Sequence, residues 1–325
     1  MVAKAAKNPA AEEEPSPDNG RFTDGFDDLV ERYDGTHPPD PASIPDVLYH
    51  YTNASGLHGM LGSGSIWLSH YRYLNDTSEI QHTESLLREV LSAALESTPS
   101  DISSKILSQL VDKRSLSSDF DIYIFSLSEQ KDSLSQWRGY ASEGRGFTMG
   151  LDTKELLKHK KKKEVDGGFD LFRVEYDRSR QIKVLKDALQ EIIERAEENV
   201  SSGTELSEAT ENAVWCFQFI SFTRSVMNKH ASFRDENEWR VALIAQRPAD
   251  TDKEWDSDIK VRVRGSELIP YLVVKPGLKG KLPLRSIGVG PGFSRGNQTN
   301  AVRSLCGALG YAPTIYNADT PYTRD

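Results

Sequence analysis

Two short groups of polar residues stand in stretches that otherwise favour buried strands, and each could do chemistry. The first is His50, Tyr51 and Thr52, at the end of an apolar run that starts near residue 46. An imidazole and a hydroxyl can hydrogen-bond a sugar and an amide, and a tyrosine ring can stack on a flat ligand. A surface-exposed strand end explains the same triplet, so these three residues leave both interpretations open.

The second group is Glu236 and Glu238, in the stretch DENEWRVALI. In a strand these two side chains would point the same way, because side chains repeat every second residue. Two such carboxylates are costly to bury unless a cation lies nearby. Arg240 continues the same face and Lys229 is close in sequence, which predicts a salt-bridged face. The functional interpretation is a carboxylate that binds a sugar hydroxyl and stabilises positive charge at an anomeric carbon.

A third segment, SLSEQKDSLSQWRGYASEGRGF, is a candidate for the wall of a cleft. Trp137 and Tyr140 are three residues apart and so share one face of a helix. We expect Trp137 in the core and Tyr140 against a ligand. Gly144 and Gly146 then predict a tight turn, where a backbone can approach a planar ligand closely.

A fourth segment, YLNDTSE, contains two strong turn formers, Asn75 and Asp76. Asp76 suits the N-cap of the helix that follows. The alternative is that Asn75 or Asp76 faces the pocket built by residues 50–52. We expect no metal site, because His50, His58 and His70 lack ligand spacing and have no cysteine companions.

Composition indicates a folded protein with an acidic start. Of the 325 residues, 37% are hydrophobic and 27% charged, and the net charge is −9. No apolar run is long enough to cross a bilayer, so we expect no membrane association and a cytoplasmic location. Residues 1–45 are predicted to be a disordered acidic tail and linker, with a short amphipathic segment near its end that can dock as a helix.

Cysteine and lysine usage adds two expectations. Cys216 and Cys306 lie in separate apolar stretches, which predicts two buried thiols rather than a disulfide framework. The lysine run at 158–163 is typical of a solvated helix end or loop, and contact with RNA or phosphate is the alternative.

Alternating hydrophobic patterns predict an α+β fold over residues 46–325, as a single catalytic-type domain. We expect mixed, mainly antiparallel central sheets with flanking helices and a helical insertion at about 178–228. Strands are expected at 46–51, 65–69, 120–128, 146–152, 172–177, 238–245, 259–265, 270–275, 285–290 and 313–318. Helices are expected after Asn53, through residues 77–97, 101–113, 132–141, 178–202 and 205–228, and near residues 297–310.

Several blocks together resemble a bacterial family known as domain of unknown function 2971. They are LYHYT, IWLSHYRYLNDTSE, FSLSEQKDSLSQWRGYASEGRGFTMGLD, FRDENEWRV, SIGVGPG and the closing TPYTRD. The resemblance spans roughly residues 46–325, except for the charged and helical middle. The family name implies no activity.

The order of an early His-x-Thr, an aromatic cleft segment and a late Glu-x-Glu is also similar to the ADP-ribosyltransferase fold. That resemblance implies NAD as a substrate, with no metal. His50 and Thr52 would bind NAD, and Tyr140, or else Tyr51, would stack on nicotinamide. By the same resemblance Glu238 would be catalytic. The remaining roles would fall to Glu236, which would orient the acceptor, and to Ser126 and Ser128, which would shape the NAD site.

Three functions compete on the sequence. The first is an NAD-dependent ADP-ribosyltransferase or NAD glycohydrolase, a toxin or antiphage effector that modifies a protein or nucleic acid and has a neutralising partner protein. The second is a non-catalytic ligand- or partner-binding module, in which residues 50–52 are structural. The third is a magnesium-dependent nuclease or other hydrolase, for which Asp76, Glu79, Glu236 and Glu238 could supply ligands.

Overall fold

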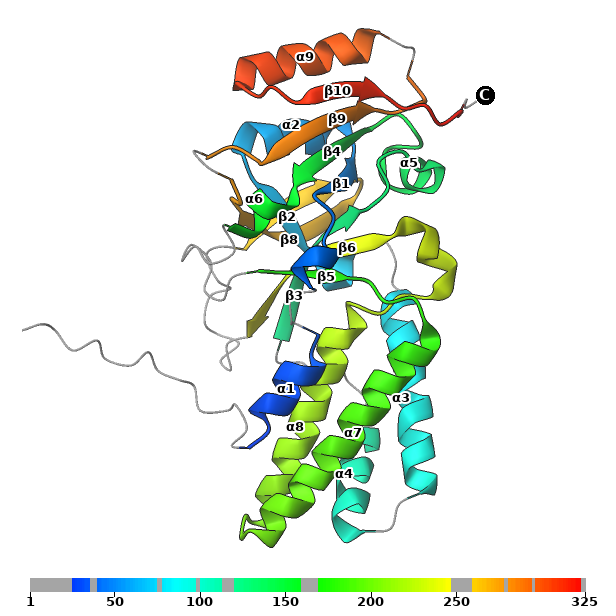
Figure 1. Cartoon of the computed structure of the whole chain (residues 1–325), viewed down its shortest axis with the longest axis vertical. Helices are drawn as coiled ribbons and strands as arrows, with labels where there is room; N and C mark the ends of the chain where they lie inside the picture. Colours follow the sequence, from blue (N-terminus) through cyan, green and yellow to red (C-terminus); the bar gives the residue numbers. More distant parts are fainter. Residues whose placement is uncertain are drawn as a thin grey trace, which may run out of the picture.

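The sheet and the longest helices lie at opposite ends of the molecule, with the sheet at the top of Figure 1 and these helices at the bottom. This computed structural model describes residues 25–35, 40–74, 78–97, 100–112, 120–158, 169–246, 259–277, 280–293 and 296–322. The fold class is α+β, as the alternating patterns predicted.

The strands form one branched sheet. In chain order they are β1 (Val47–Thr52), β2 (Ile66–His70), β3 (Phe120–Ser128), β4 (Phe147–Asp152), β5 (Asp170–Arg173), β6 (Glu238–Gln246), β7 (Lys260–Arg264), β8 (Glu267–Val274), β9 (Leu284–Val289) and β10 (Thr314–Asn317). Their spatial order is β10-β9-β4-β1-β3-β2-β8-β7, and β6 pairs with both β3 and β5. Paired strands are antiparallel except β9 and β10, so the sheet is mixed and mainly antiparallel, as expected.

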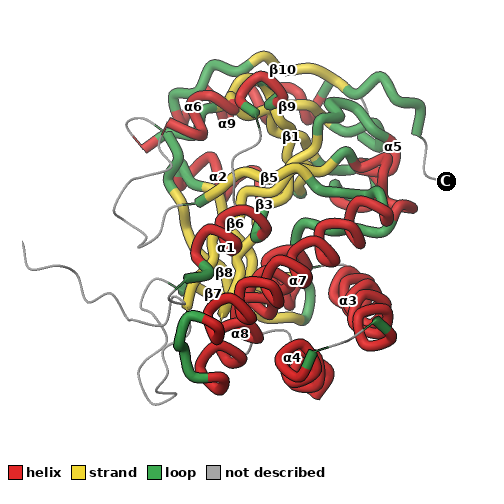
Figure 2. The backbone as a smooth tube through the Cα atoms, turned by 60° about the horizontal axis from the view of Figure 1, so that its bottom comes forward, coloured by secondary structure: helices red, strands yellow, loops and turns green. Residues whose placement is uncertain are grey.

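Helices cover the sheet and build the lower half. They are α1 (Asp27–Tyr33), α2 (Ala54–Ser63), α3 (Ser78–Glu96), α4 (Asp101–Asp112), α5 (Leu134–Tyr140), α6 (Thr153–Lys158), α7 (Arg178–Ser201), α8 (Leu206–Ser225) and α9 (Asn297–Leu309). Three 3₁₀ helices are η1 (Pro41–Ser43), η2 (Tyr71–Tyr73) and η3 (Ala231–Glu236). α2, α5, α6 and α9 lie with the sheet, whereas α1, α3, α4, α7 and α8 form the lower bundle (Figures 1 and 2).

The sheet splits beside β3. One edge of β3 pairs with β6 along the whole of residues 120–128. The other edge is shared, because β1 pairs with β3 at Tyr49↔Ser128 and β2 pairs with it at Ser69↔Ile124 and His70↔Tyr123. β1 and β2 therefore diverge from each other, and on this edge the stretch of β3 between these pairings has no strand partner among the described strands.

The ends of α2 fix the path of the chain as it leaves β1. Asn53 caps the helix, since its Oδ1 accepts a hydrogen bond of 2.8 Å from the Gly56 amide. Gly64 ends the helix in a left-handed conformation with φ of 62°, which glycine adopts without steric cost. The sequence predicts the start of this helix after Asn53, and the cap at Gly64 returns the chain directly into β2.

The lower bundle is built from two separate segments of the chain. The expected helices at 178–202 and 205–228 are α7 and α8, and α3 and α4 pack against them (Figure 2). α8 is buried on several sides, with Phe217, Ile220 and Phe222 at most 2% exposed. The helical insertion predicted for the middle of the chain is therefore only part of the bundle, because residues 78–112 complete it.

The N-terminal assignment needs one correction. Within the 1–45 segment, the expected amphipathic helix is present as α1, and Phe26 and Leu29 are buried against the bundle. Arg195 of α7 also donates a 2.9 Å hydrogen bond to Asp28. The folded body thus includes α1, because its apolar face contributes to the core. Residues 1–24 lie outside the described residues.

Three smaller expectations have clear outcomes. Cys216 and Cys306 are both buried free thiols, as predicted. α6 ends at Lys158, and the rest of the lysine run lies outside the described residues. None of the described helices is both long and apolar enough to span a bilayer.

Gly146, in the turn between α5 and β4, gives a test of how tightly this part of the fold is packed. A Cβ at this position would lie 2.4 Å from the Thr52 carbonyl oxygen and 2.7 Å from that of Ala141. We expect Gly146→Ala to lower the free energy of unfolding by about 1–3 kcal/mol, because backbone atoms must move apart. Urea unfolding would measure it.

Gly139→Ala is the matched control, since a Cβ at Gly139 in α5 meets nothing within 4 Å. Alanine is the better helix former, so this variant should be neutral or slightly more stable. Equal stability of the two variants would contradict the close approach at Gly146.

Candidate functional site

His50 occupies the split in the sheet. Its Nδ1 lies 2.9 Å from the carbonyl oxygen of Ser126, and its ring stacks on Phe125 with centroids 4.1 Å apart. A carbonyl oxygen only accepts, so Nδ1 carries the proton and Nε2 is the acceptor of the neutral ring. The side chain thus takes up a backbone acceptor at the point where β1 and β2 diverge.

The imidazole of His50 is held in its neutral form. Burial lowers its pKa to about 4, since desolvation disfavours the charged ring. The hydrogen bond with Ser126 works in the opposite direction, and the positive charge of Arg262 lowers the pKa further. At neutral pH the ring therefore offers one donor, already used, and one acceptor.

The two candidate glutamates belong to a compact set of buried charges. Lys229 Nζ lies 2.6 Å from Glu236 Oε2 and 3.0 Å from Glu238 Oε2. Arg240 donates two hydrogen bonds to the Glu238 carboxylate, from Nε at 2.8 Å and from Nη2 at 2.9 Å. Lys229 and Arg240 are each 2% exposed, Glu238 5% and Glu236 8%. Two carboxylates thus meet two cations, and the predicted salt-bridged face is present.

The route by which the two glutamates meet differs from the prediction. Only Glu238 lies in a strand, because Glu236 ends η3 and Asn237 between them adopts a left-handed conformation with φ of 42°. Asparagine is one of the few residues that adopts this conformation readily. The carboxylates converge through that turn and through their shared cation, Lys229, rather than through strand periodicity.

Backbone contacts hold the charge cluster in place. The Tyr176 hydroxyl accepts a hydrogen bond of 3.0 Å from the Glu238 amide, and Ser128 Oγ donates one of 2.6 Å to the Glu236 carbonyl. The Lys229 amide donates to the Glu175 carbonyl at 3.0 Å. The cluster is therefore anchored to the sheet and to the segment that leads into α7.

Glu238 is ionised and its acceptor sites are filled. Burial alone would raise its pKa, but the charges of Arg240 and Lys229 outweigh burial and lower the pKa to about 2. Its donors are two from Arg240, one from Lys229 and the Ser126 hydroxyl. A carboxylate offers about four acceptor sites, so a further donor must displace one of these.

Tyr140, at the end of α5, links the aromatic segment to this cluster. Its hydroxyl donates a 2.9 Å hydrogen bond to Glu236 Oε1. Burial raises the pKa of the phenol, and the neighbouring glutamates act in the same direction, so the hydroxyl stays protonated. Tyr140 is half-buried and borders the same open space as His50.

One cavity joins these groups. It has a volume of about 240 Å³, and its lining includes His50, Thr52, Ser126, Tyr140 and Glu238. A recess of about 50 Å³ is lined by four of the same residues and adds Glu236. Side chains from β1, β3, α5, η3 and β6 therefore meet at the split in the sheet. The structure brings these predicted residues together.

Tyr51 also lines the cavity and the recess, and it packs on Trp137. The Tyr51 hydroxyl donates to the Gln130 carbonyl at 2.8 Å and accepts from the Ser133 amide at 3.0 Å, and its ring meets Trp137 edge-on at 4.9 Å. Trp137 is fully buried and donates to Asp132 at 2.6 Å. These contacts support the wall of the cavity, and the stacking role offered for Tyr51 stays a prediction.

Two predicted candidates cannot be placed, and Arg262 is among the lining residues that the sequence did not indicate. Asn75 and Asp76 lie outside the described residues. Arg262 of β7 lines the cavity although it is more than 200 positions from His50 in sequence. The alternating pattern KVRVR predicts the strand, but nothing local indicates which distant residues its arginine approaches.

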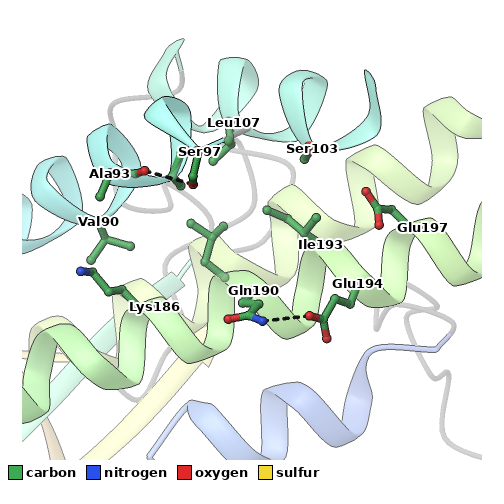
Figure 3. Close-up of a pocket in the computed structure, with 12 residues that line it drawn as sticks. Val90, Ala93, Ser97, Ser103, Leu107, Lys186, Gln190, Ile193, Glu194 and Glu197 are labelled. Carbon is green, nitrogen blue, oxygen red and sulfur yellow. Dashed lines mark hydrogen bonds between the residues drawn. The ribbon is translucent and has the colours of Figure 1, made fainter. Parts of the chain in front are cut away.

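A larger cavity lies in the helical half, between α3, α4 and α7 (Figure 3). It has a volume of about 540 Å³ and an apolar floor that includes Leu107 and Ile193. Its polar side chains are engaged locally, as Gln190 donates to Glu194 at 3.0 Å and Ser97 to the Ala93 carbonyl at 3.2 Å. Reactive groups do not converge there as they do at the split.

A metal site finds no support in the part of the chain that the structure describes. No group of three or more His, Cys, Asp or Glu side chains in it could hold a metal ion. Glu236 and Glu238 are instead paired with cationic side chains. The magnesium-dependent interpretation therefore has no observation in its favour.

Comparison with known proteins gives one match. Residues 136–241 match the model of a family described as a protein of unknown function, DUF2971. This segment runs from within α5 into the first residues of β6 and contains Tyr140, Lys229, Glu236, Glu238 and Arg240. Neither a curated protein nor a solved structure gave a significant match. The chain is thus similar to that family over the part that carries the charge cluster.

His50 is expected to titrate near pH 4 rather than near pH 6.5, because its charged form is buried. A group whose pKa is lowered by folding contributes stability that is lost as the pH falls from 6.5 towards 4. The stability difference between wild type and His50→Phe should therefore shrink over this range, by at most about 3 kcal/mol. Unfolding at several pH values would measure it, and an NMR titration of the ring near pH 6.5 would contradict it.

Lys229→Met should be strongly destabilising, because it leaves one buried negative charge in excess. Losing one partner of a buried pair costs about 3–5 kcal/mol, whereas the exposed pair Lys183–Asp187 should yield less than about 1 kcal/mol in Lys183→Met. Urea unfolding compares the two variants. Adding Glu236→Gln to Lys229→Met should recover part of the loss, and equal costs for both lysines would refute the buried cluster.

Proposed function

We propose that this chain is an NAD-dependent ADP-ribosyltransferase that cleaves the nicotinamide–ribose bond in the cavity at the split of the sheet. The observation that carries the proposal is the convergence of His50, Tyr140 and Glu238 on one cavity. These residues come from distant segments, and each has the chemistry that its role needs. The resemblance of the sequence to the ADP-ribosyltransferase fold named the same three residues.

His50 suits a sugar hydroxyl. Its Nε2 is an acceptor at neutral pH because Nδ1 donates to Ser126, and the stack on Phe125 fixes the ring. Thr52, two residues further along β1, adds a hydroxyl to the same lining. An acceptor and a hydroxyl at a rigid strand end can orient a ribose and an amide.

The size and shape of the cavity suit part of NAD. Ligand pockets for drug-sized molecules measure about 300–1,000 Å³, so 240 Å³ and the adjoining recess fit a nicotinamide riboside better than a whole dinucleotide. In this arrangement the nicotinamide ring lies against Tyr140, and the adenosine half extends towards the mouth. The Tyr140 hydroxyl is bonded to Glu236, which holds the ring against rotation.

Glu238 supplies the carboxylate for the bond cleavage. Nicotinamide leaves with the electron pair of the C–N bond, and the positive charge that develops on the ribose is stabilised by an ionised carboxylate. Because the acceptor sites of Glu238 are filled, a ribose hydroxyl takes the place of the Ser126 hydroxyl, the one neutral donor on that carboxylate. The two cationic donors remain and keep Glu238 ionised.

The second substrate then completes the reaction. A nucleophile of a protein or nucleic acid bonds to the ribose carbon and loses its proton, whereas water at the same position gives NAD hydrolysis. Glu236 lies beside Glu238 and, among the described residues, its side chain accepts from Lys229 and Tyr140, so it retains acceptor capacity to orient that nucleophile. Either outcome fits an intracellular effector such as a toxin or an antiphage protein.

One observation favours a second candidate, a non-catalytic binding module. The four donors on Glu238 and the neutral sum of the cluster are what a structural salt-bridge network requires. In that case the cavity binds a ligand or partner without bond cleavage. Glu238→Gln distinguishes the two candidates. If Glu238 is purely structural, the substitution changes stability but removes no enzymatic activity.

Nicotinamide release from NAD by purified protein is the deciding measurement, with wild type beside Glu238→Gln. We expect release by the wild type and a loss of about 100-fold or more in the variant, since the charge that stabilises the transition state is gone. Cell lysate and RNA are offered as acceptors, and Glu267→Gln, at an exposed side chain that begins β8, is the control that should keep full activity.

Glu238→Gln also removes one of the two carboxylates that balance Lys229 and Arg240, so its melting temperature must be recorded. Tyr140→Phe is the second variant, because it keeps the ring and removes only the hydrogen bond to Glu236. It should remain folded and release nicotinamide more slowly. Wild-type protein that neither binds nor cleaves NAD would eliminate the transferase and leave the binding module.

A further inference from the structure

The cavity at the split carries one more positive charge than its carboxylates neutralise. Glu236 and Glu238 are balanced by Lys229 and Arg240, and His50 is neutral. Arg262 also lines this cavity, and its charge reaches His50, whose pKa it helps to lower. Among the described residues no carboxylate pairs with Arg262. A ligand that fills the cavity therefore meets a surplus cation.

The guanidinium of Arg262 is held in place but keeps an unused donor. It lies beside two neighbouring rings, with centroid distances of 5.8 Å to Trp67 and 6.0 Å to Tyr271, and its Nη2 donates to Ser69 Oγ at 2.8 Å. Its Nε is buried and has no hydrogen-bond partner among the described residues. A buried donor without a partner is destabilising, so an acceptor at this point would be stabilising.

We propose that Arg262 binds a phosphate group of the ligand, and that β7 and β2 thereby add an anion subsite to the cavity. The identification of that phosphate as part of the NAD pyrophosphate rests on the proposed function. The subsite itself rests on Arg262 and its neighbours alone.

The donors at this wall fit phosphate. Because Ser69 Oγ accepts from Arg262, its own proton is available to a second acceptor, and Ser69 lines the cavity too. Asn53 and Gly56, from the start of α2, lie on the same lining and bring the positive end of that helix to it. A planar guanidinium with a free edge and a neighbouring hydroxyl is well suited to the several oxygens of a phosphate.

The placement also divides the cavity into two chemically different sides. His50, Ser126 and Glu238 form one side that suits a sugar, where Lys229 and Arg240 balance the charge of Glu238, whereas Arg262 of β7 and Ser69 of β2 form a cationic side. A molecule with a sugar next to a phosphate matches both sides. This pairing explains why a strand far along the chain contributes an arginine to a cavity built around β1 and β3.

The test measures binding of NAD and of inorganic pyrophosphate to wild type, Arg262→Gln and Arg264→Gln, by calorimetry and by the shift in melting temperature. Arg264→Gln is the matched control, because it removes the same charge from β7. Arg264 lies two residues further along that strand and pairs with Glu267 at 2.9 Å. We expect Arg262→Gln to weaken binding of both probes about 10–100-fold and Arg264→Gln to leave it within about twofold.

Four outcomes separate this inference from the proposed function. Weaker binding of both probes to Arg262→Gln, but not to Arg264→Gln, supports the anion subsite. NAD binding that is unchanged in Arg262→Gln overturns it and leaves the transferase standing. If the wild type does not bind NAD, but pyrophosphate raises its melting temperature and does not raise that of Arg262→Gln, the proposed function fails and the anion subsite remains. Binding of neither probe to the wild type overturns both.

Arg262→Lys guards against a folding defect in the glutamine variant. It keeps the charge and the aliphatic stem beside Trp67 and Tyr271 but loses the planar fork. Its melting temperature without ligand should match the wild type, and its affinity for pyrophosphate should fall between those of wild type and Arg262→Gln. Wild-type affinity in both Arg262 variants would again overturn the inference.

Discussion

The neutral set of buried charges at Lys229, Glu236, Glu238 and Arg240 is the constraint on which the rest of the structure depends. Each ion gives up hydration that is worth several kcal/mol, and the opposite charges and hydrogen bonds of the cluster compensate for that loss. The four residues come from the segment after α8, from η3 and from the first residues of β6. The bundle and the sheet must therefore keep their relative position, because any shift would leave a buried charge without its partner.

The split in the sheet follows from the same junction. β6 carries Glu238 and Arg240 and pairs with β3 along its whole length, so β1 and β2 must share the other edge of β3. Two strands that share one edge cannot both follow it, and the gap between them becomes a cavity. His50 satisfies the carbonyl of Ser126 in that gap, which gives the cavity a wall as rigid as a strand without closing it.

The sequence predicts the strands and the conspicuous polar residues of this site, but not the contacts that depend on distant segments. All ten described strands lie at or near expected positions, because alternation and β-branched residues are local signals. The Glu236–Glu238 contact was expected from strand periodicity, yet it arises from a left-handed Asn237. The packing of residues 78–112 on α7 and α8, and the approach of Arg262 to the cavity, depend on topology, which no local pattern encodes.

The charge cluster limits how Glu238 can act on a ligand. Since the cluster is neutral, any stabilisation of developing positive charge comes from its orientation rather than from its net charge. Glu238 and Lys229 line the cavity, whereas Arg240 extends away from it and donates at 2.6 Å to the Val226 carbonyl at the end of α8. The carboxylate therefore faces the cavity with its strongest partner behind it. In the proposed function, a ligand close to Glu238 experiences the negative end of this ion pair first, while Arg262, which pairs with no carboxylate among the described residues, presents a positive charge on another side of the cavity. The two ends together would favour a molecule that is electron-poor at one point and anionic at another.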